Sequence, residues 1–230
     1  MRDVLIRNIS TASTTLVSVS PDGLSSGDQH SAGLEISDDG NVVAFYSSAS
    51  NLVATDTNGT VDIFARNISG TTTTLVSVRA DGLDSSNNGA FNHVMSDDGN
   101  VIAFASYSDG LVTNDTNGVY DIFARNISNE TTTLVSVLAD GSNGGNRHSL
   151  QPVINVDGSV IAFRSDAFDF VADDTNDRPD VFVSDLTNPV MLASRADVTV
   201  PNLSGNESSG LQSSTRRQVL SEDGRYLIFQ

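Results

Sequence analysis

Short runs of apolar and β-branched residues alternate with turn-forming clusters along the whole chain, without the 3.6-residue spacing of an amphipathic helix. In one stretch, "FNHVM" precedes an Asp-Asp-Gly turn at 97–99, and "VIAFAS" follows it. The connection "YSDGLVTNDTNG" then leads to "DIFARNI" and "TTTLVSV". Turn chemistry separates each of these runs from the next, so the pattern predicts four short strands per stretch and an all-β chain.

The four-strand pattern repeats along the chain. The first marker is an aspartate that opens the third predicted strand and recurs every 59 positions, at Asp3, Asp62, Asp121 and Asp180. The second marker opens the hairpin between the first two strands, with steps of 59, 59 and 66, at Ser37, Ser96, Asn155 and Ser221. The repeats 3–61, 62–120, 121–179 and 180–230 therefore form one predicted domain, 1–230, in which the last unit has an insertion.

The repeated strands predict sheets that stack on one another. Residues 101–104 are apolar on both faces of their strand, which favours a position between two neighbouring sheets. The threonine-rich fourth strand is expected at the outer edge. Four-stranded units that cannot bury both faces alone stack radially as the blades of a β-propeller. An open β-solenoid is the alternative, although its coils are usually much shorter.

The chain starts and stops inside a repeat. It begins at a third strand, with Asp3, and ends after a second strand, at Phe229, which gives sixteen predicted strands. If "VLSEDGRYLIF" supplies the inner half of a blade and "DVLIRNISTASTTLVSV" the outer half, the N- and C-terminal strands close a propeller of four four-stranded blades without a free sheet edge. The alternative is a fragment of a longer propeller.

Composition narrows the class of partner. The 230 residues include 29 acids and 12 bases, all of them arginine, for a net charge of −17. This charge opposes binding to nucleic acid or anionic membranes and favours cations or basic partners. The absence of cysteine is compatible with export, and no apolar run approaches the ~20 residues of a membrane span. We expect an extracellular or periplasmic location and no membrane insertion; a lineage-wide acidic bias is the alternative explanation of the charge.

The strand order predicts one loop-rich face. In a meander, the connections between strands two and three emerge at the same end as the connections between consecutive blades. The Asp-Thr-Asn loops and the variable loops at 22–33, 81–92, 140–151 and 197–214 therefore share a face. Loops on a rigid scaffold are where binding usually resides, so this face is the predicted functional one.

Each loop before a third strand offers side-chain oxygens at positions 1, 3 and 7. The residues are Asp56, Asn58, Asp62, Asp115, Asn117, Asp121, Asp174, Asn176 and Asp180. Calcium takes several oxygen ligands around a tightly turning backbone, and Gly59 and Gly118 allow such a turn. The pattern predicts a calcium ion in each loop, most readily in the third, where Asp173 and Asp177 add charge. Alternatively, the Asp and Asn side chains only cap their own turns.

The sequence offers little catalytic machinery. The three histidines are His30, His93 and His148, and the first and last occupy the same repeat position. No cysteine, no GxSxG elbow at a strand-to-helix turn and no histidine-rich metal cluster is present, so nucleophilic and zinc catalysis lack their parts. We therefore expect a protein that is not an enzyme.

Two combined motifs resemble a known repeat family. The hairpin "S-x-D-G-x-x-x-A-F", followed by "D-T-N-G-x-x-D-I-F-x-R-N" and "T-T-T-L-V-S-V", resembles the WD40-like (PD40), TolB-type β-propeller repeats of exported bacterial proteins over almost the whole chain. The likeness is strongest in the first three units. It implies a non-enzymatic binding or structural propeller that recognises a protein or a glycan through its loop face. The alternative is the propeller module of a larger secreted hydrolase or peptidase.

Overall fold

The computed structural model describes residues 1–172, 174–194 and 220–229. These residues form fourteen β-strands and no α-helix. The described chain accordingly has no helix long and apolar enough to span a bilayer. The predicted all-β class is confirmed for this part of the chain.

The strands form one two-stranded and three four-stranded antiparallel sheets. The two-stranded sheet consists of β1 (Leu5–Asn8) and β2 (Ser13–Leu16). The next sheet consists of β3 (Ser31–Ile36), β4 (Val42–Ser47), β5 (Asp62–Asn67) and β6 (Thr72–Leu75). The third consists of β7 (Ala90–Met95), β8 (Val101–Ser106), β9 (Asp121–Asn126) and β10 (Thr131–Leu134). The fourth consists of β11 (Ser149–Ile154), β12 (Ile161–Ser165), β13 (Asp180–Ser184) and β14 (Met191–Leu192).

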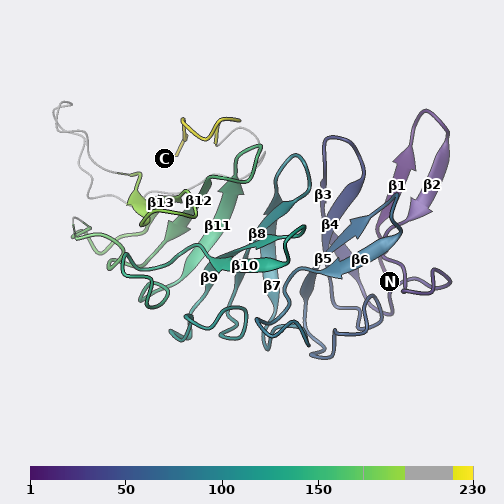
Figure 1. Ribbon diagram of the computed structural model, residues 1–230, viewed down its shortest axis with the longest axis horizontal. Helices are drawn as coiled ribbons and strands as arrows, with labels where there is room; N and C mark the ends of the chain where they lie inside the picture. The colour runs from purple at the N-terminus through teal and green to yellow at the C-terminus, as the bar shows by residue number, and fades with distance from the viewer. Residues whose placement is uncertain (173, 195–219, 230) are drawn as a thin grey trace.

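Each four-stranded sheet is a simple meander in sequence order. Figure 1 shows the sheets side by side in a row, from β1–β2 at one end to β11–β14 at the other, in the manner of propeller blades. The threonine-rich strands β6 and β10 lie at the sheet edges, as predicted. This arrangement confirms the predicted four strands for the units between 31 and 192.

The hydrophobic core lies between successive sheets. Every residue of β8 is buried. Ala103 packs in a cluster with Ile161 of the following sheet, whereas Phe104 packs with Ile63 of the preceding one. Because successive side chains of a strand point to opposite faces, a strand buried on both faces is apolar throughout. The prediction that residues 101–104 lie between two sheets is confirmed.

Neighbouring sheets are also joined through their Asp-Gly hairpin turns. The Asp38 amide donates to the Asp97 carbonyl at 2.8 Å, and the Asp97 amide donates to the Val156 carbonyl at 2.9 Å. Gly99 in this turn has φ +75°, and a Cβ on it would lie 2.7 Å from Val42 of the preceding sheet. Only glycine allows both this backbone conformation and this close approach. The Asp-Gly turns therefore set the spacing between sheets.

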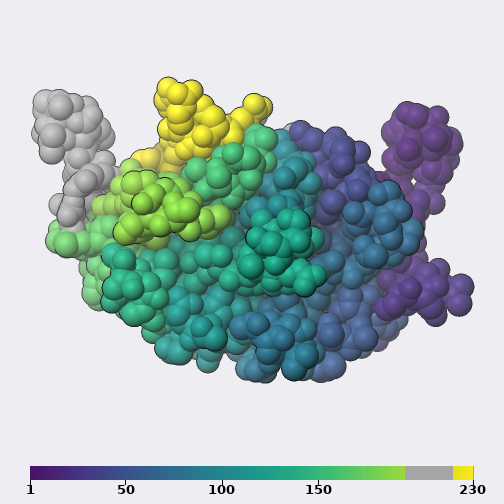
Figure 2. Space-filling model, viewed as in Figure 1, coloured from purple at the N-terminus to yellow at the C-terminus, as the bar shows by residue number. Residues whose placement is uncertain are grey.

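The described residues do not form the closed four-bladed ring that the sequence predicts. In the described residues, β1 pairs only with β2, and the C-terminal segment forms its own bridge between Leu220 and Leu227. This segment instead continues the row, because the Val156 amide donates to the Glu222 carbonyl. Figures 1 and 2 show the N-terminal hairpin and residues 220–229 far apart.

Candidate functional site

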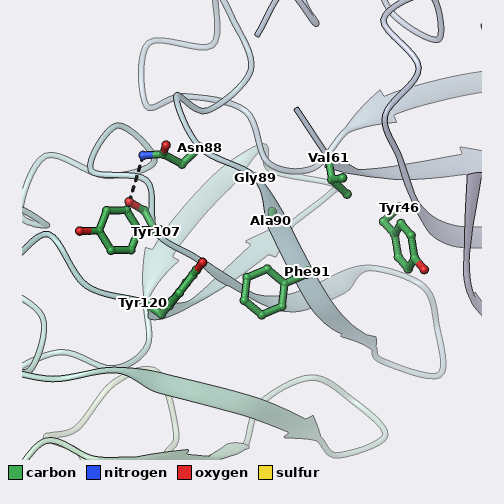
Figure 3. Close-up of a pocket in the computed structure, with 8 residues that line it drawn as sticks. All are labelled: Tyr46, Val61, Asn88, Gly89, Ala90, Phe91, Tyr107 and Tyr120. Atoms are coloured by element: carbon green, nitrogen blue, oxygen red, sulfur yellow. Dashed lines mark hydrogen bonds between the residues drawn. The ribbon is translucent and has the colours of Figure 1, made fainter. Parts of the chain in front are cut away.

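The two sets of connections meet at one face, as predicted. The Ser85 amide, between β6 and β7, donates to the Thr55 carbonyl, between β4 and β5, at 2.9 Å. Asn88 Nδ2 donates to the carbonyl of Tyr107, which follows β8, at 3.4 Å (Figure 3). Because hydrogen bonds join the loops before and after each sheet, they form a single continuous surface.

A pocket of about 640 Å³ opens on this face. Its lining comes from the end of β4, the start of β7 and both ends of the β8–β9 connection (Figure 3). The lining residues are Tyr46, Val61, Asn88, Gly89, Ala90, Phe91, Tyr107 and Tyr120. The pocket thus includes three of the four tyrosines of the chain and no charged side chain, although the protein carries a net charge of −17.

Tyr120 is the centre of an aromatic cluster in this pocket. Its ring lies 5.1 Å from that of Phe91 and 5.2 Å from that of Tyr107, both edge to face. Such pairs hold the rings in defined orientations. Tyr107 and Tyr46 remain 40% and 37% exposed, so their rings are accessible to a ligand. The pocket is therefore a partly rigid aromatic surface with tyrosine hydroxyls around it.

The first strand of each four-stranded sheet has a β-bulge. The register shifts in β3, β7 and β11, and the left-handed residue of each bulge recurs every 59 positions, at Gly33, Asn92 and Gln151. At Gly33, a Cβ would lie 2.3 Å from the ring of Tyr46. The bulge and its missing side chain together allow Tyr46 to lie across β3. Bulges of this kind often re-aim side chains next to functional sites.

The aromatic lining departs from the repeat. The residues 59 positions before and after Tyr107 are Ser48 and Asp166, and those around Phe91 are Ala32 and Leu150. The backbone is nevertheless the same at these positions, because the three sheets share their topology. The fold therefore does not require aromatic residues here. Sequence reasoning missed this site, although comparing the repeats position by position gives the signal.

The predicted metal ligands of the β4–β5 connection are brought together as hydrogen-bond partners. Asn58 Nδ2 donates to Asp62 Oδ2 at 2.7 Å and to the Ser86 carbonyl at 2.6 Å, while its Oδ1 accepts the Thr60 amide. The β8–β9 connection repeats this pattern, since Asn117 Nδ2 donates to Asp121 Oδ2 at 2.7 Å. Each asparagine thus presents its amino group, not its oxygen, to the aspartate.

The β12–β13 connection has the same pair. Asn176 Nδ2 donates to Asp180 Oδ2 at 3.0 Å. The Asp177 carboxylate is exposed and pairs with Arg147 at 2.6 Å. Asp173, which was expected to add charge to this loop, lies outside the described residues.

A serine that the sequence analysis did not single out completes each of these clusters. Ser77 Oγ donates to Asp62 Oδ1 at 2.5 Å and accepts the Ile63 amide at 3.1 Å. Equivalent bonds join Ser136 to Asp121 and Ser194 to Asp180. This serine, which belongs to "LVSV" in the first two clusters and to "MLAS" in the third, therefore fastens the end of the fourth strand to the start of the third. We call each aspartate with its asparagine and serine an Asp–Ser–Asn node.

Burial dominates the electrostatics of these loops. It raises the pKa of Asp62 to about 6 and that of Asp121 to about 7, against the opposing hydrogen bonds from their serine and asparagine partners. Burial also raises the pKa of Asp56 and, to about 6, that of Asp115. These carboxylates would accept a proton or a cation more readily than ordinary surface aspartates.

Two predicted ligands, Asp115 and Asp174, have buried carboxylate oxygens that accept no hydrogen bond. Asp115 is 3% exposed, and its Oδ1 accepts no hydrogen bond. In the preceding connection, Ser85 donates to the equivalent Asp56, but the position equivalent to Ser85 is Gly144. The missing hydroxyl explains the unpaired oxygen of Asp115. Asp174 is also buried, burial raises its pKa, and neither of its carboxylate oxygens accepts a hydrogen bond.

No three His, Cys, Asp or Glu side chains gather closely enough to hold a metal ion anywhere in the described ranges. The histidines have other surroundings. His30 Nδ1 accepts the Arg2 amide, His148 Nδ1 accepts the Tyr120 amide, and His93 is buried. The predicted calcium ions thus have two carboxylates per loop at most, and any further ligands have to be carbonyls or water.

Comparisons with known proteins identify no family. No family model and no curated protein match the sequence. TolB from Acinetobacter baumannii aligns at 16% identity over 83% of this chain and 37% of its own, with a TM-score of 0.42. The tricorn protease aligns at 12% identity over 77% and 15%, with a TM-score of 0.47. The β-propeller domain of the Trilobed protease from Pyrococcus furiosus aligns at 10% identity over 83% and 48%, also at 0.47.

This chain therefore spans less than half of each of these proteins. All three TM-scores lie below one half, so the likenesses assign neither a family nor an activity.

Proposed function

We propose that this protein is a non-enzymatic binding module that recognises a neutral glycan in the tyrosine pocket between β4, β7 and the β8–β9 connection. The observation that supports it is a lining of four aromatic rings without a charged side chain, on the face where the loops converge. Pockets with aromatic walls and a few polar groups are the usual form of small-ligand sites.

The chemistry of the lining favours a sugar. A pyranose ring has an apolar C–H face that packs on aromatic rings and hydroxyl groups at its rim. Tyr107 and Tyr46 offer exposed rings, and the hydroxyls of Tyr46, Tyr107 and Tyr120 make no hydrogen bond within the described chain. These hydroxyls are left to bond the rim of the sugar. An uncharged lining favours a neutral glycan over an acidic one.

The test is calorimetric titration with soluble neutral polysaccharides: xylan, galactomannan and mixed-linkage glucan. Replacing Tyr107 by alanine removes one exposed ring and is expected to weaken binding roughly five- to thirtyfold, on the order of 1–2 kcal/mol of lost contact. Tyr226→Ala is the matched control, because this fourth tyrosine is 70% exposed and does not line the pocket. No binding by wild type, or equal loss in both variants, contradicts the proposal.

A protein ligand is the second possibility, and the same variants test it. Binding of a proline-rich peptide in place of any polysaccharide, weakened by Tyr107→Ala, would give the pocket to a protein. The alternative is that the chain is the propeller module of a larger secreted hydrolase or peptidase. In that case, substrate turnover is expected only when a further domain is present.

The proposed location is extracellular or periplasmic, which the lysine-free, cysteine-free and acidic composition supports.

We also propose that calcium stabilises the β8–β9 connection. The supporting observation is the buried Asp115 oxygen that accepts no hydrogen bond, in a loop that also contains Asp121. Thermal unfolding in calcium is expected to shift upward relative to chelator, because a cation that binds only the folded state stabilises it. Asp115→Asn should remove the shift, whereas Asp22→Asn, in an exposed turn, should leave it. An unchanged midpoint in wild type would leave this loop as a simple capped turn.

A further inference from the structure

A groove beside the outer strand β6 contains a buried arginine without an acidic partner. The groove has a volume of about 320 Å³, and Arg66 on β5 is the only charged residue that lines it. Arg66 is 9% exposed, and its Nη1 donates to Thr73 Oγ1 at 3.0 Å. The other lining residues are Pro21, Leu52, Val53, Ala54, Thr71, Thr72 and Thr73. None of the ion pairs formed by the described carboxylates includes Arg66.

An unpaired charge in such a place is costly. Removing an ion from water without a counter-ion or enough hydrogen bonds costs several kcal/mol. Burial accordingly lowers the pKa of the Arg66 guanidinium, and no carboxylate offsets that effect. Since the one hydrogen bond to Thr73 uses one of five N–H donors, the others are left for a ligand.

The next sheet has an equivalent groove in which an acidic residue also lines the groove beside the arginine. There, Arg125 donates to Thr132 at 3.2 Å, and a groove of about 560 Å³ surrounds it. Glu130, which also lines that groove, occupies the position equivalent to Thr71. Burial lowers the pKa of Arg125, and the nearby Glu130 carboxylate opposes this. Both residues, Thr71 and Glu130, have the same left-handed backbone, with φ of 53° and 58°.

We infer that the Arg66 groove binds a small oxyanion, namely a carboxylate, sulfate or phosphate group. The planar guanidinium matches the two oxygens of such a group, and a charge-assisted pair of this kind is stronger than neutral hydrogen bonds. The threonine hydroxyls beside it supply further donors. In the groove at Arg125, the Glu130 carboxylate that lines it should repel such an anion. This site is separate from the tyrosine pocket and does not depend on the function proposed for it.

The test exchanges the residue that distinguishes the two grooves. Thr71→Glu introduces the negative charge that Glu130 provides in the second groove. The backbone at position 71 has the same conformation as at Glu130, so it can accept glutamate. Glu130→Thr removes it from the other. Equilibrium dialysis with radiolabelled inorganic sulfate, at an ionic strength kept constant with sodium chloride, is expected to show a single saturable site in wild type. Thr71→Glu should lose that site, and Glu130→Thr should gain a second one.

Both variants keep the arginines, and circular dichroism checks that each is folded. Absence of saturable sulfate binding in wild type, or unchanged binding in folded Thr71→Glu, overturns the inference. If Glu130→Thr gains no second site, the claim that the Glu130 carboxylate prevents anion binding at Arg125 is wrong. Parallel dialysis with inorganic phosphate, a methyl phosphate monoester and acetate tells which source is bound: equal affinity for the ester supports a group carried on a larger molecule, and preference for the inorganic ion supports a free anion.

Discussion

Replacing Ser77 by alanine should destabilise the protein far more than a single exposed serine would. Ser77 is fully buried, and its hydroxyl both donates to Asp62 and accepts the Ile63 amide. Alanine leaves the buried amide unsatisfied, at about 1–3 kcal/mol, and removes a charge-assisted bond worth about 1.5–3 kcal/mol. Because alanine is only slightly smaller than serine, almost no cavity forms. We expect a loss on the order of 3 kcal/mol.

The measurement is urea unfolding followed by far-ultraviolet circular dichroism and extrapolated linearly to water. In a chain of this size, that loss corresponds to a fall in Tm of about 6–12 °C. Ser18→Ala is the matched control, because Ser18 accepts the Val4 amide but its bond to Asp3 is longer, 3.4 Å. Ser18→Ala should lower the free energy of unfolding by about half as much as Ser77→Ala, because it mainly leaves the Val4 amide without an acceptor.

Two results would refute this reasoning. A Ser77→Ala variant within about 0.5 kcal/mol of wild type would mean that water replaces the hydroxyl at no cost, and that the node does not fasten the two strands. A Ser18→Ala variant that loses as much as Ser77→Ala would mean that the bond to the aspartate contributes nothing, and that only the amide matters.

Two further predictions follow from the buried aspartates and from the bulge. Burial raises the folded-state pKa of Asp62 to about 6 and that of Asp121 to about 7. The folded protein therefore binds protons more tightly than the unfolded chain, and the free energy of unfolding should rise as the pH falls from about 8 to about 5. A urea midpoint that instead rises with pH, measured in chelator, would contradict this sign. Gly33→Ala should cost about 2–3 kcal/mol and displace Tyr46, whereas Gly23→Ala, with φ +73° and open space around it, should cost only about 1 kcal/mol. Equal urea midpoints for the two variants would show that the ring of Tyr46 moves aside freely.

The sequence predicted the strands well because the repeat samples the same environment several times. The run from Val101 to Phe104 is apolar at every position, and such a run fits only a strand between two sheets. The closure of the ring was not predictable in the same way. It depends on the rotation from one sheet to the next, and counting strands in the sequence contains no information about that rotation.

The candidate sites show a similar division. The sequence located oxygen-rich loops, but it gave no sign that the Asn58 amino group and the Ser77 hydroxyl already bond the oxygens of Asp62. The residues that line the tyrosine pocket come from several strands and connections, and so do those that line the Arg66 groove. Only the folded chain therefore brings Tyr107 and Arg66 together with their neighbours. Tyr107 departs from the repeat, whereas Arg66 belongs to it, and only the exchange of Thr71 for Glu130 distinguishes the two grooves.

The amide contacts that pass from one hairpin turn to the next have an architectural consequence. Each turn donates to its successor through the same atoms, so every unit presents the next one with an identical docking platform. A gene that duplicates or deletes one 59-residue segment would therefore preserve all interfaces and change only the length of the array. Within such an array, the loops at one junction between neighbouring units can diverge while the turn contacts keep the sheets aligned, which lets new recognition surfaces arise one junction at a time.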